Sequence, residues 1–508
     1  MAFKRASGVL LHPTSLPGRH GIGDLGEAAY IFVDFLVASK QSIWQVLPLG
    51  PTGYGDSPYQ CFSAFAGNPM LINLDRLVDD GLLTAADVVP DPSFSHERVN
   101  FGPVIAYKTE RLKKAYEKFK TDGHRTRRLY DEFIQHEANW LEDYALFMAL
   151  KLDFGGGPWV EWPTEFIRRE PVALADAQKR LADAIGYQKF VQWIFFEQWR
   201  DVKHAANSKG IQIVGDVPIF VAHDSADAWA NPQLFYLDED GQPTVVAGVP
   251  PDYFSATGQR WGNPLYRWDV MSQSGYEWWI RRMKATLNLV DIIRIDHFRG
   301  FEAYWEIPAT EPTAIKGRWV DGPKAHFFEA VKNALGGQVP VMAENLGVIT
   351  EGVEILRKQF DMPGMRIVQF GFGSGPDNNF LPHNYDNNTV VYTGTHDNET
   401  IMGWYLRSDT TGTTDDPETV KRERLFASRY TNIKDPADAH WDFIRLAWMS
   451  VADLALVPMQ DILGLGNEAR MNYPSSESGN WQWRYTPEQL KIDHAERLAE
   501  LTHMYSRD

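Results

Sequence analysis

The stretch IIRIDHFRGF, residues 292–301, joins an apolar run typical of a buried strand to a polar end. Four polar side chains close it, namely Arg294, Asp296, His297 and Arg299. Burying an unpaired charge is costly, so these groups must be solvated, paired with other charges, or placed in a cleft where they act on a ligand. Residues two apart in a strand share a face, which predicts that Arg294 and Asp296 project together while Ile295 points the other way.

Several further apolar runs are continuous stretches of Val, Ile and Leu, the pattern of strands that are covered on both faces. Helical stretches such as 275–289 and 324–335 lie between many of them. Alternating strands and helices predict a parallel sheet, and in one long domain they predict an α/β fold of the (β/α)8 TIM-barrel type over residues 1–508. The predicted strands are 42–50, 211–221, 289–297, 339–347, 365–372, 389–398 and 454–461.

Two segments depart from this alternation. Residues from about 76 to 205 show apolar side chains at three- and four-residue spacing, which predicts a mainly helical insertion. Residues from about 236 to 260 contain an Asp240-Gly241 turn and then a Pro-Pro, Gly-rich stretch. This second segment is predicted to form a hairpin followed by a long lid loop, because loops of that length in a compact domain tend to be functional.

Composition limits the classes of partner. The chain has 508 residues, is 44% hydrophobic and carries a net charge of −17, so its surface should repel nucleic acid and anionic lipid. The apolar run at residues 9–11 is too short for a signal peptide, and no later run is long enough for a membrane span. Cys61 is the single cysteine, which fits a reducing compartment. We therefore expect a cytoplasmic protein without nucleic-acid or membrane partners.

Three carboxylates follow apolar runs and could meet at the mouth of a barrel. Beside Arg294, Asp296 should have a lowered pKa and stay ionised, as a nucleophile needs. Glu344 ends the run VPVMAE, where partial burial should raise its pKa and suit a general acid. Asp397 ends TVVYTGTHD, after His396. One charged and one protonated carboxyl are the groups that retaining glycoside chemistry uses.

Each of these residues also has a structural interpretation. Asp296 could belong to an ion pair at a strand end, Glu344 could cap a helix, and His396 could be a core histidine. Aromatic residues in loops support a sugar ligand, because flat rings stack on the apolar faces of sugars. No His/Cys cluster has zinc spacing, and the acidic run at 238–241 lacks the spacing of a calcium loop. The loop aromatics are Tyr54, Tyr59, Tyr253, Phe254 and Trp261.

Motifs along the chain resemble those of the amylomaltases, the 4-alpha-glucanotransferases or disproportionating enzymes of glycoside hydrolase family 77 in the alpha-amylase clan. The resemblance runs in order from about residue 7 to residue 485. It implies a barrel with inserted subdomains, no metal and no organic cofactor. The motifs are GVLLHPTSLPG, GPTGYGDSPYQ, GDVPIFV, GVPPDYFS, GQRWGNPLY, IRIDHFRGF, TGTHDN and LGLGNEARMNYP.

Matched residue by residue, the resemblance implies Asp296 as nucleophile, Glu344 as acid/base and Asp397 as transition-state stabiliser. It implies transfer of alpha-1,4-glucan segments between malto-oligosaccharides, starch or glycogen-type glucans. We expect a monomer or a homodimer. Residues 248–256 resemble the family's lid loop. The implied substrate contacts are Tyr54, Ser57, Tyr59, Asp216, Asp252, Tyr253, Phe254, Trp261, Arg294, His396 and Asn467.

One residue departs from the family pattern, which usually reads AEDLG where this chain reads AENLG. With Asn345 in place of an acid, Glu344 should ionise more readily, which predicts a pH optimum on the acid side.

Rival functions remain at this stage. An alpha-1,4-glucan hydrolase would use the same carboxylates, and only the resemblance favours transfer over hydrolysis. A noncatalytic glucan-binding protein would not need all three carboxylates. A Schiff-base aldolase would need a lysine at a strand end, and none occurs in the predicted strands.

Overall fold

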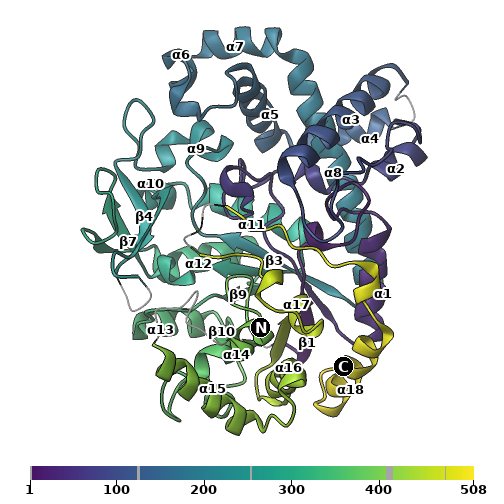
Figure 1. The fold of residues 1–508 in the computed structure, drawn as a ribbon. Coiled ribbons are helices and arrows are strands. Elements are labelled where there is room, and N and C mark those ends of the chain that lie inside the picture. Colours follow the sequence, from purple (N-terminus) through teal and green to yellow (C-terminus); the bar gives the residue numbers. More distant parts are fainter. Residues whose placement is uncertain (1–2, 123–125, 252–254, 408–415, 475, 477) are drawn as a thin grey trace.

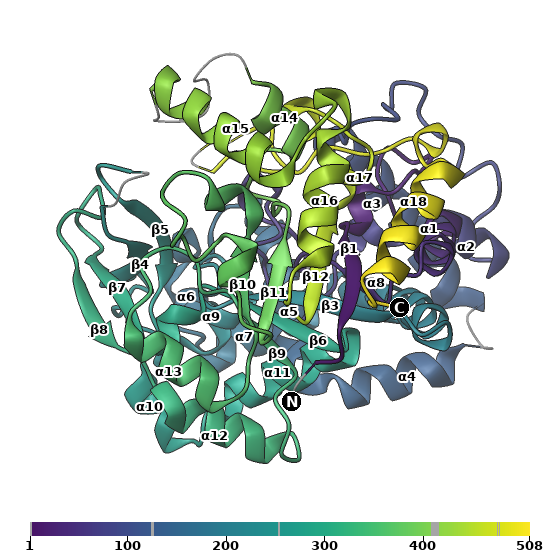
Figure 2. The same cartoon turned by 90° about the horizontal axis from the view of Figure 1, so that it is seen from below.

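Eight parallel strands close into a barrel at the centre of the molecule (Figures 1 and 2). The computed structural model describes residues 3–122, 126–251, 255–407, 416–474, 476 and 478–508. Around the barrel the strand order is β1-β12-β11-β10-β9-β6-β3-β2, which confirms the predicted (β/α)8 barrel. The strands are β1 (Ala6–Leu10), β2 (Ile43–Gln45), β3 (Gln212–Pro218), β6 (Ile292–Asp296), β9 (Val341–Ala343), β10 (Gly364–Ile367), β11 (Thr389–Tyr392) and β12 (Leu454–Pro458).

The side chains of β6 alternate between two cores. Ile292 packs inside the barrel with apolar side chains of the other strands. Ile293 and Ile295 belong to the larger core that includes the surrounding helices. Arg294 and Asp296 share the inward face and bond to each other, as the period of two predicts. The strand therefore delivers an arginine and an aspartate to the carboxyl end of the barrel.

Strand β1 is the barrel strand that the apolar runs did not predict. It pairs with β12 on one side and with β2 on the other, so it closes the barrel. Gly8 lies opposite Ile43 in this pairing, and a Cβ at Gly8 would come within 2.3 Å of the Ile43 carbonyl oxygen. Glycine is thus needed where the two strands approach most closely.

Helices cover the outside of the barrel, and a helical region between β2 and β3 forms the top of the molecule in Figure 1. Its longest helix, α8, packs against α1, α3, α4 and α5 and then leads into β3. The helices of this region are α2 (Leu74–Asp79), α3 (Phe101–Asp122), α4 (Arg127–His136), α5 (Ala138–Asp153), α6 (Thr164–Ile167), α7 (Pro171–Arg180) and α8 (Ala182–Ser208). The other helices are α1 (Glu27–Ala38), α9 (Ala226–Ala230), α10 (Trp268–Gln273), α11 (Glu277–Leu289), α12 (Lys324–Ala334), α13 (Glu351–Gln359), α14 (Ile401–Leu406), α15 (Pro417–Thr431), α16 (Ala439–Met449), α17 (Met459–Ile462) and α18 (Ile492–Met504).

A second, four-stranded antiparallel sheet lies beside the barrel, in the order β5-β4-β7-β8. An isolated bridge between Leu237 and Pro243 flanks the predicted turn at 240–241. Strands β4 and β5, which flank the predicted lid loop, pair with each other in antiparallel fashion. Strands β7 and β8 were not predicted from the sequence. The sheet strands are β4 (Val245–Val249), β5 (Gln259–Pro264), β7 (Ala303–Pro308) and β8 (Arg318–Asp321).

Two arginines from opposite ends of the chain hold the end of α16. Arg5 and Arg507 both donate to the carbonyl oxygens of Ser450 and Ala452. Carbonyls after a helix have no partner within it, so the guanidinium groups satisfy them and fix both termini beside β12. None of the helices in the described part of the chain combines the length and the apolar character that crossing a membrane requires.

Candidate active site

Arg294 links two carboxylates at the ends of neighbouring strands. Asp216 of β3 lies opposite Arg294 of β6 in the parallel register. Nη1 of Arg294 donates to both carboxylate oxygens of Asp216, at 2.7 and 2.6 Å, and to Oδ1 of Asp296 at 3.0 Å. The Asp216 side chain is fully buried, whereas 33% of the Asp296 side chain is exposed. The arginine therefore neutralises a buried carboxylate and holds the partly open one in place.

Glu344 follows β9 and is fixed by backbone groups. Its N–H donates to the Ile295 carbonyl at 3.0 Å, which places it beside the end of β6. Its Oε2 accepts from the His297 N–H at 2.7 Å, and its Oε1 accepts from the Leu346 N–H at 2.6 Å. Both carboxyl oxygens are thus oriented next to Asp296 in a buried position.

The two carboxyls share one electrostatic environment. Burial, together with the charge of Asp296, raises the pKa of Glu344 to about 7. Burial also raises the pKa of Asp296, and the opposing effect of Arg294 does not reverse this. The lowered pKa expected for Asp296 is therefore wrong as a net direction, because burial, joined by the charges of Asp216 and Asp397, outweighs the effect of the guanidinium. Since only Asp296 has a guanidinium at hydrogen-bond distance, a proton shared by the pair resides on Glu344.

Asp397 belongs to a second charged group, in the loop after β11. His396 Nε2 lies 3.3 Å from Asp397 Oδ2, and the Asn472 amide donates to Asp397 Oδ1 at 2.6 Å. Burial opposes ionisation, but the charge and hydrogen bond of His396 hold the pKa of Asp397 well below its usual range. Asp397 in turn raises the pKa of His396 against the effect of burial. This carboxyl is therefore ionised at neutral pH.

Tyr59 connects the two charged groups. Its hydroxyl donates to Asp216 Oδ2 at 2.8 Å, and its ring stacks on His396 with centroids 5.0 Å apart. Ser57 supports this loop, because its Oγ accepts from the Tyr59 N–H at 3.2 Å. The structure thus brings seven predicted residues into one cluster, namely Tyr59, Asp216, Arg294, Asp296, Glu344, His396 and Asp397.

Three further residues contact this cluster and were not singled out from the sequence. Asn472 binds the Asp397 carboxylate, and Arg470 donates to the Asp397 carbonyl at 2.5 Å. The Trp481 ring lies 5.9 Å from both the Tyr59 and the His396 rings. Asn472 and Arg470 occur in the motif ARMNYP, but no periodicity or spacing distinguishes them.

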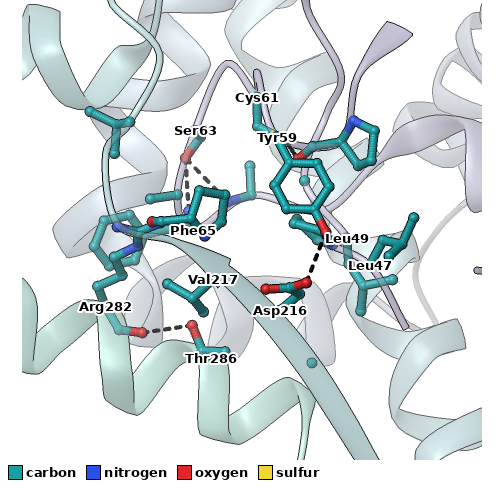
Figure 3. Close-up of a pocket in the computed structure, with 18 of the residues that line it drawn as sticks. Leu47, Leu49, Tyr59, Cys61, Ser63, Phe65, Asp216, Val217, Arg282 and Thr286 are labelled. Atoms are coloured by element: carbon teal, nitrogen blue, oxygen red, sulfur yellow. Dashed lines mark hydrogen bonds between the residues drawn. The ribbon is translucent and has the colours of Figure 1, made fainter. Parts of the chain in front are cut away.

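A cavity of about 70 Å³ lies beside Tyr59 and Asp216 (Figure 3). Its wall is largely apolar, with Leu47, Leu49 and Val217 among the lining residues. The volume suits a few water molecules and is well below that of ordinary ligand pockets. We conclude that this cavity is too small to be the place of a sugar ring.

The remaining predicted contacts lie outside the cluster. Tyr54 is 73% exposed. The Trp261 ring meets the His297 ring edge-on at 4.8 Å. Asn467 donates to Glu399 Oε1 at 2.7 Å, two residues beyond Asp397 along the chain. Asp252, Tyr253 and Phe254 lie outside the residues that the structure describes.

Asn345 does not face Glu344, which the sequence argument assumed. Its Nδ2 donates to Glu354 Oε1 at 2.6 Å, and its Oδ1 accepts from the Met365 N–H at 2.7 Å. The amide thus ties the end of β9 to β10 and α13. The acid-side pH optimum expected from Asn345 stays a prediction, because its side chain is bonded to Glu354 and Met365 and not to Glu344.

In the described residues, no group of three or more His, Cys, Asp or Glu side chains is arranged to hold a metal ion.

The family model described as 4-alpha-glucanotransferase, glycoside hydrolase family 77, matches residues 11–491. The chain belongs to the 4-alpha-glucanotransferase family. The enzyme is thus a transferase that acts on glucans, and neither hydrolysis nor binding alone is favoured.

Similar proteins cover the whole chain. The enzyme is 51% identical to the 4-alpha-glucanotransferase of Thermus thermophilus over 515 residues, with all of both chains covered. It is 50% identical to that of Synechocystis sp. over 511 residues, covering 100% of this chain and 99% of the relative. Its structure matches the amylomaltase of Streptococcus agalactiae in complex with acarbose, with a TM-score of 0.93, 42% identity, and coverage of 99% and 100% of the two chains.

Proposed function

We propose that the enzyme transfers alpha-1,4-glucan segments by a retaining double displacement, with Asp296 as nucleophile and Glu344 as acid/base. The observation that carries this proposal is the contrast between the two carboxyls. Asp296 is paired with Arg294 through Oδ1, which leaves Oδ2 to attack. Glu344 has its pKa raised to about 7 by burial and by Asp296, so it holds a proton near neutral pH.

In the first step, an Asp296 oxygen bonds to C1 of the donor glucosyl unit as the C1–O4 bond breaks. Glu344 gives its proton to the departing O4, so the shortened glucan leaves as a neutral alcohol. In the second step, Glu344 takes the proton from the 4-hydroxyl of an acceptor, whose oxygen attacks C1 and releases Asp296. Asp397, which is held ionised beside His396, would stabilise the positive charge that develops at the sugar ring.

The substrates we propose are malto-oligosaccharides and longer glucans of the starch or glycogen type. The acarbose in the Streptococcus agalactiae amylomaltase supports an oligosaccharide ligand. Tyr59 would stack on the donor sugar, and the exposed Tyr54 would contact longer chains. The net charge of −17 argues against nucleic acid as a partner. We further propose a monomer or a homodimer, which sedimentation can decide.

Incubation with maltotriose tests the proposal. We expect free glucose and longer oligosaccharides without a net gain of reducing ends, whereas a hydrolase would increase reducing ends. Asp296→Asn should abolish both products, and Asp75→Asn, at an exposed ion pair, is the matched control. Glu344→Ala should lose transfer from maltotriose. With an alpha-maltosyl fluoride donor, whose leaving group needs no proton, azide should restore turnover, because it is a nucleophile that needs no general base. If Asp296→Asn keeps parental activity, the proposed mechanism is wrong.

A further inference from the structure

His297 follows Asp296 and adopts a backbone conformation that is unusual for a residue with a side chain. Its φ is 52° and its ψ is 48°, in the left-handed region. In this conformation its N–H donates to Oε2 of Glu344 at 2.7 Å, while its carbonyl accepts from the Gly300 N–H at 3.0 Å. Strained backbone at such a position is retained where the surrounding structure requires it. Here it brings an N–H to the acid/base.

The ring of His297 is buried and faces the second sheet. It meets Trp261 of β5 edge-on, with centroids 4.8 Å apart and an interplanar angle of 85°. Its Nε2 is buried and has no hydrogen-bond partner among the residues that the structure describes. Burial, followed by the charge of Arg299, lowers the pKa of His297 to about 3, so the ring is neutral. A neutral ring leaves the charge balance at Glu344 unchanged and serves as a packing surface for Trp261.

We propose that His297 is a positioning residue that orients Glu344 through its left-handed backbone and seats Trp261 through its ring. One residue thereby ties the acid/base to the β4–β5 hairpin, where Trp261 is an expected substrate contact. The inference rests on the proposed role of Glu344. The other groups that face Glu344 are Asp296 and Arg294 from β6 and the Leu346 N–H from its own loop.

Three variants separate the backbone from the ring. His297→Gly and His297→Asn both tolerate the left-handed region and keep the N–H, but they remove the ring. His297→Val disfavours that region and should withdraw the N–H from Glu344. A hydrogen bond to the ionised form lowers a carboxyl pKa, so its loss raises the pKa. The basic limb of the kcat/KM–pH profile should therefore move up by about one pH unit in His297→Val alone.

The rates give a second readout. We expect kcat to fall by about 10- to 100-fold in His297→Val, because the acid is no longer aligned. In His297→Gly and His297→Asn, kcat should stay near that of the parent while KM for maltotriose rises, because Trp261 has lost the ring that it packs against. Should His297→Val fail to fold, His297→Ala is a milder substitution. The basic limb of its kcat/KM–pH profile should lie between those of His297→Asn and His297→Val.

Two outcomes would overturn the inference. The first is a parental basic limb in a folded His297→Val, and the second is an equal shift in the Gly and Asn variants. The azide experiment on Glu344→Ala distinguishes a failure of this inference from a failure of the proposed function. Azide rescue combined with a parental limb in His297→Val would leave Glu344 as acid/base and remove His297 from the mechanism.

Discussion

Tyr59 and His396 stack with their ring centroids 5.0 Å apart and their planes inclined by 19°. The Tyr59 hydroxyl donates to Asp216, and His396 lies 3.3 Å from Asp397. This pair of rings therefore joins the carboxylates held by Arg294 to the carboxylate beyond β11. A substitution at Tyr59 should therefore affect both Asp216 and His396.

Removing parts of Tyr59 should separate its two contacts. Tyr59→Phe loses the hydrogen bond to Asp216 and keeps the stack on His396, so kcat/KM should fall about 10-fold. Tyr59→Ala also loses the stack, and we expect a further loss of about 10-fold. Steady-state transfer from maltotriose measures both. Equal losses in the two variants would show that the ring contact contributes nothing.

Asp216→Asn should destabilise the fold as well as the site. The Asp216 side chain is fully buried and binds Arg294 with both oxygens. Breaking such a pair leaves a buried charge with less compensation, so the free energy of unfolding should fall by about 3–5 kcal/mol. Urea unfolding provides the measurement. Asp75→Asn, at an exposed pair with Arg19, should cost about 1 kcal/mol or less, and a similar cost at both sites would contradict the argument.

The pH dependence of transfer should follow Glu344. As an acid it must be protonated, so the rate of the first step should fall as pH rises through about 7, where burial and Asp296 place its pKa. Rapid-quench measurement of that step from pH 5 to 9 tests this. A basic limb near the ordinary glutamate value would contradict it.

The same pKa makes a prediction about stability. Folded Glu344 binds its proton up to about pH 7, whereas the unfolded group loses it near 4.5. The resulting stabilisation is full below 4.5 and is lost as pH rises through 7, amounting to about 3 kcal/mol. Urea unfolding of the parent relative to Glu344→Gln, at pH 5 and pH 8, should show this decline. A difference that does not change with pH would refute it.

The barrel was predictable from the sequence to the extent that its strands are continuous apolar runs. The alternation in β6 was readable because inward and outward residues differ in polarity at a period of two. Strand β1 was missed because its run is short and its partners, β2 and β12, lie far along the chain. Strands β7 and β8 were missed because neither is a long apolar run, and β8 is also a short edge strand of the second sheet.

The residues that hold the site were harder to foresee than the carboxylates themselves. Asn472 binds Asp397 from a loop with no regular pattern, and the pairing exists only in three dimensions. The backbone N–H of His297 orients Glu344 because His297 has a positive φ, and a histidine in the sequence does not predict that backbone angle. The pKa direction expected for Asp296 was wrong for a related reason, since the sequence shows Arg294 nearby but neither the burial of Asp296 nor the charges of Asp216 and Asp397.

Asn345→Asp should affect stability more than pH dependence. Asn345 is buried and donates to Glu354 Oε1 at 2.6 Å, and a carboxylate there would lose this donor and repel Glu354. We expect the free energy of unfolding to fall by about 1–3 kcal/mol. The basic limb of the rate profile should rise by less than about half a pH unit, because the new charge faces Glu354, which is itself paired with Arg357, and not Glu344.

Adding Glu354→Gln to Asn345→Asp tests the cause. Gln removes the like charge and can donate to the new aspartate, so the double variant should recover much of the lost stability, giving a favourable coupling in a double-mutant cycle. Glu354→Gln alone is the matched control, since it weakens the contact with Arg357 without creating repulsion. Two results would count against this account. They are an absence of coupling, and a shift of a whole pH unit in Asn345→Asp, which would restore the direct effect on Glu344 expected from the sequence.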